Sequence, residues 1–255
     1  MQKGLTELVF ILDKSGSMGG LEKDTIGGFN SMLKKQKQEA GQCRVTTVLF
    51  DNRYTLLHDR IDIQAVSPIT EKEYFVGGST ALLDAIGRTI GKIADVQRNT
   101  AEAYRAEKVI FVIITDGEEN ASREFSAEKV RSLVSWEKEQ HGWEFLFLGA
   151  NIDAVVTAGR FGIGADRAAE YVSDAEGTAL NYAVMNDVVS EFRFSGKVSP
   201  KHLDRIRQDR AKRGSREAQR DPAQKTIKRD GFKPSRCSSY RKETGFCFRR
   251  APFRL

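Results

Sequence analysis

Three short polar stretches carry the oxygen-bearing side chains that could do chemistry in this sequence. The first, DKSGS at residues 13–17, follows directly on the apolar stretch VFIL. The second, GGST at 77–80, precedes a helix-like segment, and the third, TDG at 115–117, follows the most apolar stretch of the chain. Hard cations such as Mg²⁺ prefer oxygen ligands, whereas Zn²⁺ and Cu²⁺ favour imidazole or thiolate. The candidate metal ligands, all oxygen donors, are Asp13, Ser15, Ser17, Thr80 and Asp116.

The balance of charge among these five side chains favours a metal that also accepts a ligand from outside the chain. Three of the ligands are neutral hydroxyls and two are carboxylates, so a bound divalent cation keeps a strong attraction for another anion. Mg²⁺ also prefers octahedral coordination and usually retains water. We therefore predict a Mg²⁺ site, with Mn²⁺ as the alternative ion. One coordination position is open to an Asp or Glu carboxylate of a partner protein.

Each polar loop taken alone has a simpler explanation. Asp13 or the two serines could cap the helix that begins near residue 20, and Asp116 could be a turn residue. The convergence of three such loops in one predicted sheet favours the metal site over these local roles. Nearby, we expect Glu118 and Glu119 to form a solvated acidic rim, Asp84 to be a supporting or surface residue, and Asp51 to belong to a turn.

The apolar periodicity predicts alternating strands and helices. Strands are expected at 6–12, 43–50, 54–60, 107–115, 143–150 and 168–173, and helices at 21–39, 81–96, 126–140, 153–162 and 174–194. Alternation of this kind is typical of an α/β fold. We predict a doubly wound, mainly parallel six-stranded sheet with one antiparallel edge strand, formed by the hairpin at 43–60, and helices on both faces. Ligand sites in such sheets lie at the carboxyl ends of the strands, where the three polar loops are found.

Together the motifs resemble those of the von Willebrand factor A-type (vWA) domain family. DKSGS matches the family's Asp-x-Ser-x-Ser motif, GGSTALLDAI its threonine loop, and VIITDGEEN its second aspartate loop, in the expected order over residues 5–194. The resemblance implies a vWA/Rossmann-like fold and a metal-ion-dependent adhesion site (MIDAS) whose ligands are the five residues named above. The chain also resembles the stand-alone cytoplasmic members found in bacteria.

The end of the chain differs from the rest in charge. Residues 195–255 contain 19 lysines and arginines and 6 acidic residues, whereas the preceding residues contain 22 basic and 29 acidic residues. Few aliphatic residues remain there to build a core. We therefore predict a vWA domain at 1–194 and a basic, mostly disordered tail at 195–255, with one helix near 200–213.

Each hypothesis of an enzymatic function requires a residue that the sequence does not provide. A phosphatase with an aspartyl nucleophile at Asp13 needs a second acid two positions later, where this chain has Ser15. A serine nucleophile needs a positioned base. The three histidines, His58, His141 and His202, fall in an edge strand, after a helix and in the tail, and we expect them at the surface. No phosphate-binding glycine loop is present either, so we predict that the protein is not an enzyme.

The remaining features concern location and partners. Cys43, Cys237 and Cys247 are too scattered for a disulfide framework or a zinc site, and we see no signal peptide or membrane helix, which favours the cytoplasm. The leading hypothesis is a metal-dependent protein-binding module with a MIDAS site. The alternative is an adaptor that binds nucleic acid or protein through its basic tail and uses the metal structurally.

Overall fold

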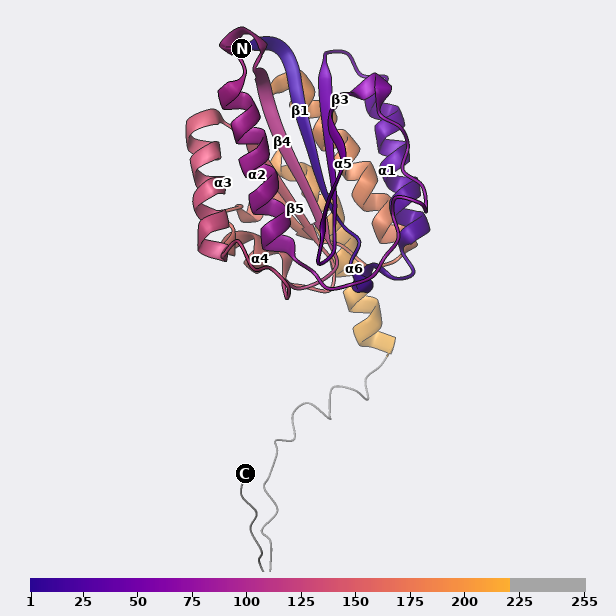
Figure 1. Cartoon of the computed structure of the whole chain (residues 1–255). Helices are drawn as coiled ribbons and strands as arrows, with labels where there is room; N and C mark the ends of the chain where they lie inside the picture. Colours follow the sequence, from indigo (N-terminus) through magenta and orange to yellow (C-terminus); the bar gives the residue numbers. More distant parts are fainter. Residues whose placement is uncertain (221–255) are drawn as a thin grey trace, which may run out of the picture. The chain divides into compact units, whose positions relative to one another are not determined.

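The computed structural model describes residues 1–220, and these residues form the predicted α/β architecture (Figure 1). Six strands make one sheet in the order β3-β2-β1-β4-β5-β6, and only the β2–β3 pair is antiparallel. The doubly wound, mainly parallel sheet with one antiparallel edge strand is therefore confirmed. The strands are β1 (Gln2–Asp13), β2 (Cys43–Phe50), β3 (Tyr54–Asp62), β4 (Ala106–Thr115), β5 (Glu144–Gly149) and β6 (Ala168–Glu170).

Helices cover both faces of the sheet. Helices α1 (Glu22–Gln36), α5 (Ala175–Ser195) and α6 (Asp204–Arg220) pack on one face, and α2 (Leu82–Asn99), α3 (Ala127–His141) and α4 (Ala154–Arg160) on the other (Figure 1). Within the described residues, no helix has both the length and the apolar character needed to cross a bilayer.

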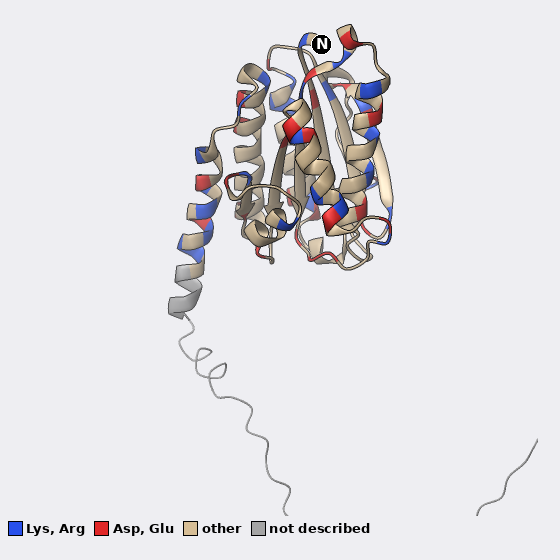
Figure 2. Cartoon of the chain, turned by 90° about the vertical axis from the view of Figure 1, so that its left-hand side faces the viewer, with Lys and Arg blue, Asp and Glu red and all other residues tan. Residues whose placement is uncertain are grey.

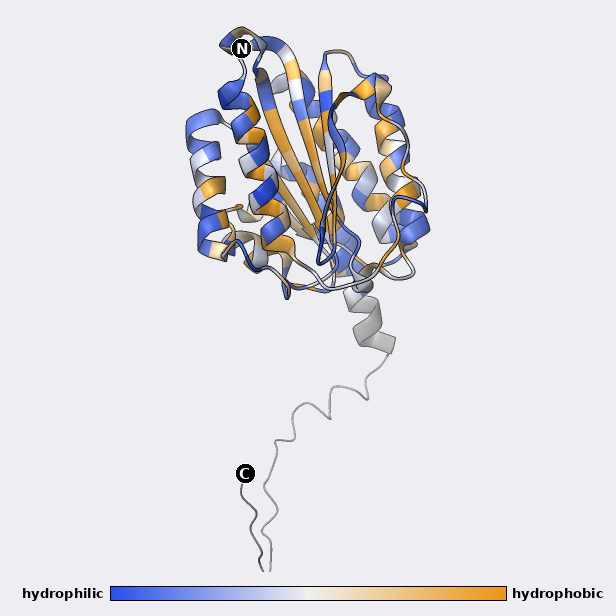
Figure 3. Ribbon diagram, viewed as in Figure 1, coloured by the Kyte–Doolittle hydropathy of each residue, from blue (hydrophilic) through white to orange (hydrophobic). Residues whose placement is uncertain are grey.

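The central strand β1 shows why the sheet is covered on both sides. Leu8, Phe10 and Leu12 join the core beneath α1 and α5, whereas Val9 and Ile11 join the core beneath α2 and α3. All five side chains are at most 1% exposed, and Figure 3 shows the same apolar character along the neighbouring strands. Because successive side chains point to opposite faces, a one-residue slip of β1 would exchange its two sets of core contacts.

The stretch at 61–76, for which the sequence shows no clear pattern, lines the α1 side of the sheet. It contains a short 3-10 turn, Ile63–Ala65, followed by irregular chain whose Val66 and Ile69 are buried. Tyr74 is 1% exposed, and its hydroxyl donates a hydrogen bond of 2.5 Å to the carbonyl oxygen of Asp13. This segment therefore supports the end of β1, where the first polar loop begins.

The compact part of the chain extends past the predicted boundary near residue 195. The chain divides into two units, Met1–Ser215 and Arg216–Leu255, so residues 196–215 belong to the first. Val198, Leu203 and Ile206 are at most 6% exposed and join the core beneath α1 and α5. The boundary prediction is wrong because three well-spaced apolar residues suffice to dock a highly charged segment.

Arginines of α6 contribute to this docking through acidic residues of the domain (Figure 2). Arg210 pairs with Glu170 at 2.9 Å, and Arg213 pairs with Asp174 at 2.6 Å. The predicted helix near 200–213 is present as the turn Pro200–Leu203 and the start of α6. The disorder predicted for the rest of the tail concerns residues 221–255, which lie outside the described part of the chain.

Leu203→Ala tests whether residues 196–215 are part of the folded domain. Leu203 is fully buried, so its truncation in the full-length chain should lower the free energy of unfolding by about 2–5 kcal/mol. Urea denaturation measures this change. Phe194→Ala is the matched control because Phe194 is 91% exposed, and it should change stability little. Equal stability of the Leu203→Ala variant and the wild type would show that this segment does not contribute to the core.

Candidate metal centre

Asp13 lies at the carboxyl end of β1, between the carboxyl ends of β2 and β4. Its connection leads to α1 and β2 on one side of the strand, whereas β4 begins the other half of the sheet, so Asp13 is at the topological switch point. The Asp13 carboxylate is 1% exposed. Its Oδ1 accepts the backbone N–H of Ser15 at 2.7 Å, and its Oδ2 accepts the hydroxyl of Thr115 at 2.6 Å. One oxygen is therefore fixed by the loop that follows β1 and the other by the last residue of β4.

The three predicted hydroxyls gather beside this carboxylate. The Oγ atoms of Ser15 and Ser17 are 3.1 Å apart. A Cβ atom built on Gly117 would lie 3.0 Å from Ser17 Oγ and 3.2 Å from Thr80 Oγ1, so these two hydroxyls flank the same backbone position. Gly117 is thus the residue that leaves room for the loops to approach, because a side chain there would displace one of the hydroxyls.

Asp116 is held from the opposite half of the sheet. Its Oδ2 accepts the hydroxyl of Ser173 at 2.6 Å and the amide of Asn151 at 3.4 Å. Asp116 Oδ1, however, is buried and has no hydrogen-bond partner in the described part of the chain. The structure therefore brings all five predicted ligands together and leaves one carboxylate oxygen unsatisfied at their centre.

The electrostatics of the two acids call for a cation. Burial raises the pKa of the Asp13 carboxyl and of the Asp116 carboxyl. Within residues 1–220, neither carboxylate forms an ion pair with a lysine or arginine. A buried, uncompensated carboxylate is unfavourable, and two close together are more so. The donor set, with one free buried carboxylate oxygen and several hydroxyls, fits a hard divalent ion.

Backbone hydrogen bonds join the loops into one rigid unit. The N–H of Gly16 donates to the carbonyl of Gly78 at 3.1 Å, and the N–H of Gly77 donates to the carbonyl of Lys14 at 2.9 Å. Gly78 has a φ of +75°, and a Cβ there would lie 2.5 Å from Asn52 Oδ1, so only glycine fits. These contacts fix the first loop against the second.

The second loop is joined to the third in the same way. Thr80 N–H donates to Asn120 Oδ1 at 2.9 Å, and Asn120 N–H donates back to the Thr80 carbonyl at 3.0 Å. Together with the Thr115–Asp13 hydrogen bond, these contacts close a ring around the site. The positions of the ligand oxygens are therefore set before any ligand arrives.

Several residues that support the candidate ligands were not predicted from the sequence. Thr115 is part of the TDG stretch but received no role. Asn151 follows β5 and Ser173 follows β6, so the rule that ligands gather at the carboxyl ends of strands would have found both if applied to every strand. Lys14 and Asp51 form a buried ion pair of 3.1 Å beneath the first loop. Asp51 also accepts the N–H of Arg53 at 2.6 Å, as its predicted turn role requires.

Two expectations about nearby residues are wrong. Glu119 is not a solvated rim residue, because its carboxylate accepts the N–H groups of Leu83, Ala121 and Ser122 at 2.7–2.9 Å. His58 is not at the surface: it is 6% exposed, with Nδ1 3.0 Å from the hydroxyl of Thr47. Glu119 accepts from its own loop as well as from the distant Leu83, and His58 contacts the neighbouring strand β2.

Asp84 was expected to be either a supporting or a surface residue, and the structure shows the supporting role. It is 9% exposed and accepts the N–H groups of Arg123, Glu124 and Phe125, each at 2.9 Å. Burial acts to raise the pKa of Asp84, but these three donors outweigh it and hold the pKa below its ordinary value. Asp84 thus anchors the loop that follows Asp116 onto α2.

No protein-family model matches the chain, and no curated protein matches it. Three solved structures that it resembles are proximal thread matrix protein 1 from the mussel byssus with a zinc-occupied MIDAS motif, a von Willebrand factor type A protein from Catenulispora acidiphila, and manganese-loaded Plasmodium vivax TRAP protein. The TM-scores are 0.50, 0.49 and 0.45 at 17%, 15% and 19% identity. The matches cover 74%, 72% and 58% of this chain.

The same matches cover 46%, 42% and 58% of the other chains, so the chain spans only about half the length of these proteins. The likeness concerns the fold, which this chain shares with the mussel protein at a TM-score of 0.50. Within the described residues, no cluster of three or more His, Cys, Asp or Glu side chains forms a metal site. The candidate centre is therefore of the mixed hydroxyl and carboxylate kind.

Asp84→Asn tests the anchoring role of this carboxylate. Replacing a charged acceptor of three backbone N–H groups should lower the free energy of unfolding at pH 7 by about 1–3 kcal/mol. Because the folded-state pKa lies below 3.8, the stabilisation is present above that pH and is lost as the pH falls through the folded-state pKa. The difference between variant and wild type should therefore shrink in acid, as measured by urea denaturation across pH.

Asp95→Asn on the same helix is the control for the Asp84 variant. Asp95 is 64% exposed in an ion pair with Arg98, and exposed pairs contribute little. Equal effects of the two substitutions at pH 7 would contradict the anchoring role of Asp84.

Proposed function

We propose that this chain is a metal-dependent protein-binding module with a MIDAS-type site. A divalent cation, Mg²⁺ or Mn²⁺, is held there by Asp13, Ser15, Ser17, Thr80 and Asp116. The observation that carries this proposal is the buried Oδ1 of Asp116, which has no hydrogen-bond partner among the described residues, beside a second buried carboxylate that has no counter-charge among them. The zinc-occupied MIDAS motif in the mussel protein, which shares the fold, supports it.

The surface around the site suits a macromolecular partner. Asp13, Ser15, Thr80 and Asp116 are at most 3% exposed, whereas Ser17 is exposed, so the site has a buried base and an open rim. When bound, the ion would have only two anionic ligands from this chain, the other three being neutral hydroxyls, so it could still accept an anionic ligand from outside. The ligand that completes the site is an Asp or Glu carboxylate of the partner protein.

Binding without catalysis is part of the same proposal. His58 contacts Thr47 in the sheet, and His202 lies 2.7 Å from Glu191. His141 is the last residue of α3, at the end of the helix remote from the polar loops. None of the three histidines of the chain contacts the candidate centre, so hydrolysis by a Ser or Asp nucleophile has no histidine base there.

A cytoplasmic location also belongs to this proposal. Cys43 is buried and has no disulfide partner within the described part of the chain, which is consistent with a reducing compartment. Cys237 and Cys247 lie outside the described residues, as does most of the basic tail on which the alternative function depends.

Metal addition and the Asp116→Asn variant test the centre itself. Mn²⁺ or Mg²⁺ added to EDTA-treated protein should raise the Tm, because a ligand at 100 times its Kd stabilises the native state by about 2.7 kcal/mol. Asp116→Asn should abolish this rise without lowering the metal-free Tm, since it removes a buried uncompensated charge. Glu118→Gln, the same change at an exposed neighbour, should keep the full metal response. A metal-induced rise that survives in Asp116→Asn would refute the ligand set.

Capture of partners from native lysate tests the function. Full-length protein should retain a partner in Mg²⁺ and release it in EDTA, and Asp116→Asn should retain none, as read by mass spectrometry. Substituting the acidic residues of the captured partner one at a time should identify the single Asp or Glu that completes the site. Partners that persist in EDTA but disappear after nuclease or high-salt washing would instead support the basic tail as the binding element.

A further inference from the structure

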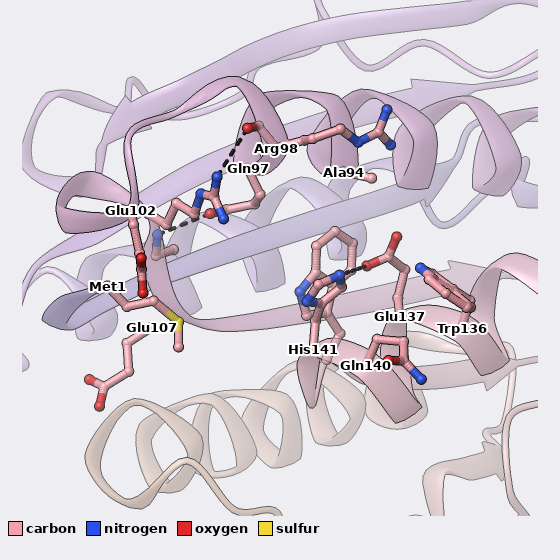
Figure 4. A pocket seen from close by; sticks show the side chains of 13 residues that line it. Met1, Ala94, Gln97, Arg98, Glu102, Glu107, Trp136, Glu137, Gln140 and His141 are labelled. Atoms are coloured by element: carbon pink, nitrogen blue, oxygen red, sulfur yellow. Dashed lines mark hydrogen bonds and ion pairs between the residues drawn. The ribbon is translucent and has the colours of Figure 1, made fainter.

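A cavity of about 480 Å³ lies at the edge of the sheet opposite the metal centre. It is bounded by the carboxyl-terminal halves of α2 and α3 and by the start of β4, and Figure 4 shows the side chains that point into it. A cavity of this size is in the range of small-molecule sites. The proposed protein-binding function uses none of its residues.

Glu137 is the central feature of this cavity. It comes from α3 and is 4% exposed, and its Oε2 has no hydrogen-bond partner in the described part of the chain. The His141 ring lies beside it, with Nε2 3.9 Å from Oε2 (Figure 4). Burial raises the pKa of the Glu137 carboxyl, and His141 and Arg98 offset this effect only in part. A buried carboxylate in this state is unfavourable until a cation approaches it.

The arginines that line the cavity are engaged elsewhere. Arg105 donates from Nε to the carbonyl of Thr100 at 2.8 Å and from Nη2 to the carbonyl of Arg98 at 3.1 Å. Arg98 forms an exposed ion pair of 3.2 Å with Asp95. Neither guanidinium makes an ion pair with Glu137 in the described part of the chain, and Arg98 acts on the charge of Glu137 only from a distance.

The cavity also offers a hydrogen-bond donor and an aromatic surface. Gln97 accepts the N–H of Ala106 through Oε1 at 3.1 Å, which leaves its buried Nε2 without a partner. Trp136 is 58% exposed at the rim, and Trp143 is 5% exposed with one face stacked on Phe111 at 5.6 Å. Indole rings favour cations and apolar groups placed over their faces.

We propose that this cavity binds a small organic cation. The ligand carries a primary ammonium or guanidinium group that donates to Glu137, an acceptor for the Gln97 amide, and an apolar body that lies against Trp136. Each requirement follows from one group around the cavity. Among the described residues, Glu137 Oε2 is a buried acceptor and Gln97 Nε2 a buried donor without a partner, and Trp136 presents an exposed indole.

Titration with four cations tests the site: agmatine, argininamide, tyramine and tryptamine. They combine the two cationic groups with aliphatic and aromatic bodies. With full-length ¹⁵N-labelled protein in physiological salt, at least one of them should shift the indole N–H signals of Trp136 and Trp143, with a Kd of about 1 mM or tighter. Calorimetry of the same ligand measures its affinity. No shift with any of the four would overturn the proposal.

Variants separate binding from a purely structural role of Glu137. Glu137→Gln should weaken binding by at least tenfold and leave the ligand-free Tm unchanged or higher, because a neutral amide replaces an unpaired charge. Trp136→Ala should weaken binding without changing stability. The exposed Glu139→Gln on the same helix should bind as the wild type does. Unchanged affinity in Glu137→Gln, or a lower ligand-free Tm, would assign Glu137 to an internal contact with His141 and overturn the site.

Discussion

The hydrogen bond from the Thr115 hydroxyl to Asp13 Oδ2 is the constraint on which the candidate centre depends. It joins β1 to β4 at their carboxyl ends, where the two halves of the sheet diverge. The first loop takes its direction from Asp13, since the N–H of Ser15 donates to the other carboxylate oxygen. The second loop is tied to the first by backbone hydrogen bonds, and the third begins directly after Thr115. The ligand oxygens are thus preorganised by the strands and need little rearrangement to bind a cation.

Preorganisation of this kind has an electrostatic cost that only a ligand can offset. The fold buries Asp13 and Asp116 without a basic partner, whereas it pairs the equally buried Asp51 with Lys14 only a short distance away. The same chain can therefore neutralise a buried acid when structure alone requires it. Glu137, at the other edge of the sheet, resembles the two metal-centre acids rather than Asp51. Uncompensated burial marks both edges as places where an external positive charge would be stabilised.

The sequence allowed correct prediction of those features that are local or periodic. Strand β2 has the predicted limits at 43–50, because its apolar run is bounded by clear turn residues. The meeting of Asp13 and Asp116, two of the five candidate ligands, was predictable because the carboxyl ends of neighbouring parallel strands lie at one edge of the sheet. The residues that orient them were harder to predict, because Asn151 and Ser173 reach Asp116 only through the order of β5 and β6 in the sheet. Glu119 and Asp84 likewise act through backbone N–H groups, which no sequence pattern reveals.

The boundary of the domain was missed for a related reason, and its true position matters for the centre. Composition separates residues 195–255 from the body, yet Arg213 of α6 pairs with Asp174, which caps α5 by accepting the N–H of Gly177 at 2.7 Å. The preceding residue, Ser173, donates to Asp116. The peptide bond between Ser173 and Asp174 therefore links the hydrogen-bond donor to Asp116, a ligand of the proposed metal, with the ion pair that holds α6. Groups in direct contact are energetically coupled, so the segment after residue 195 belongs in any physical account of the centre.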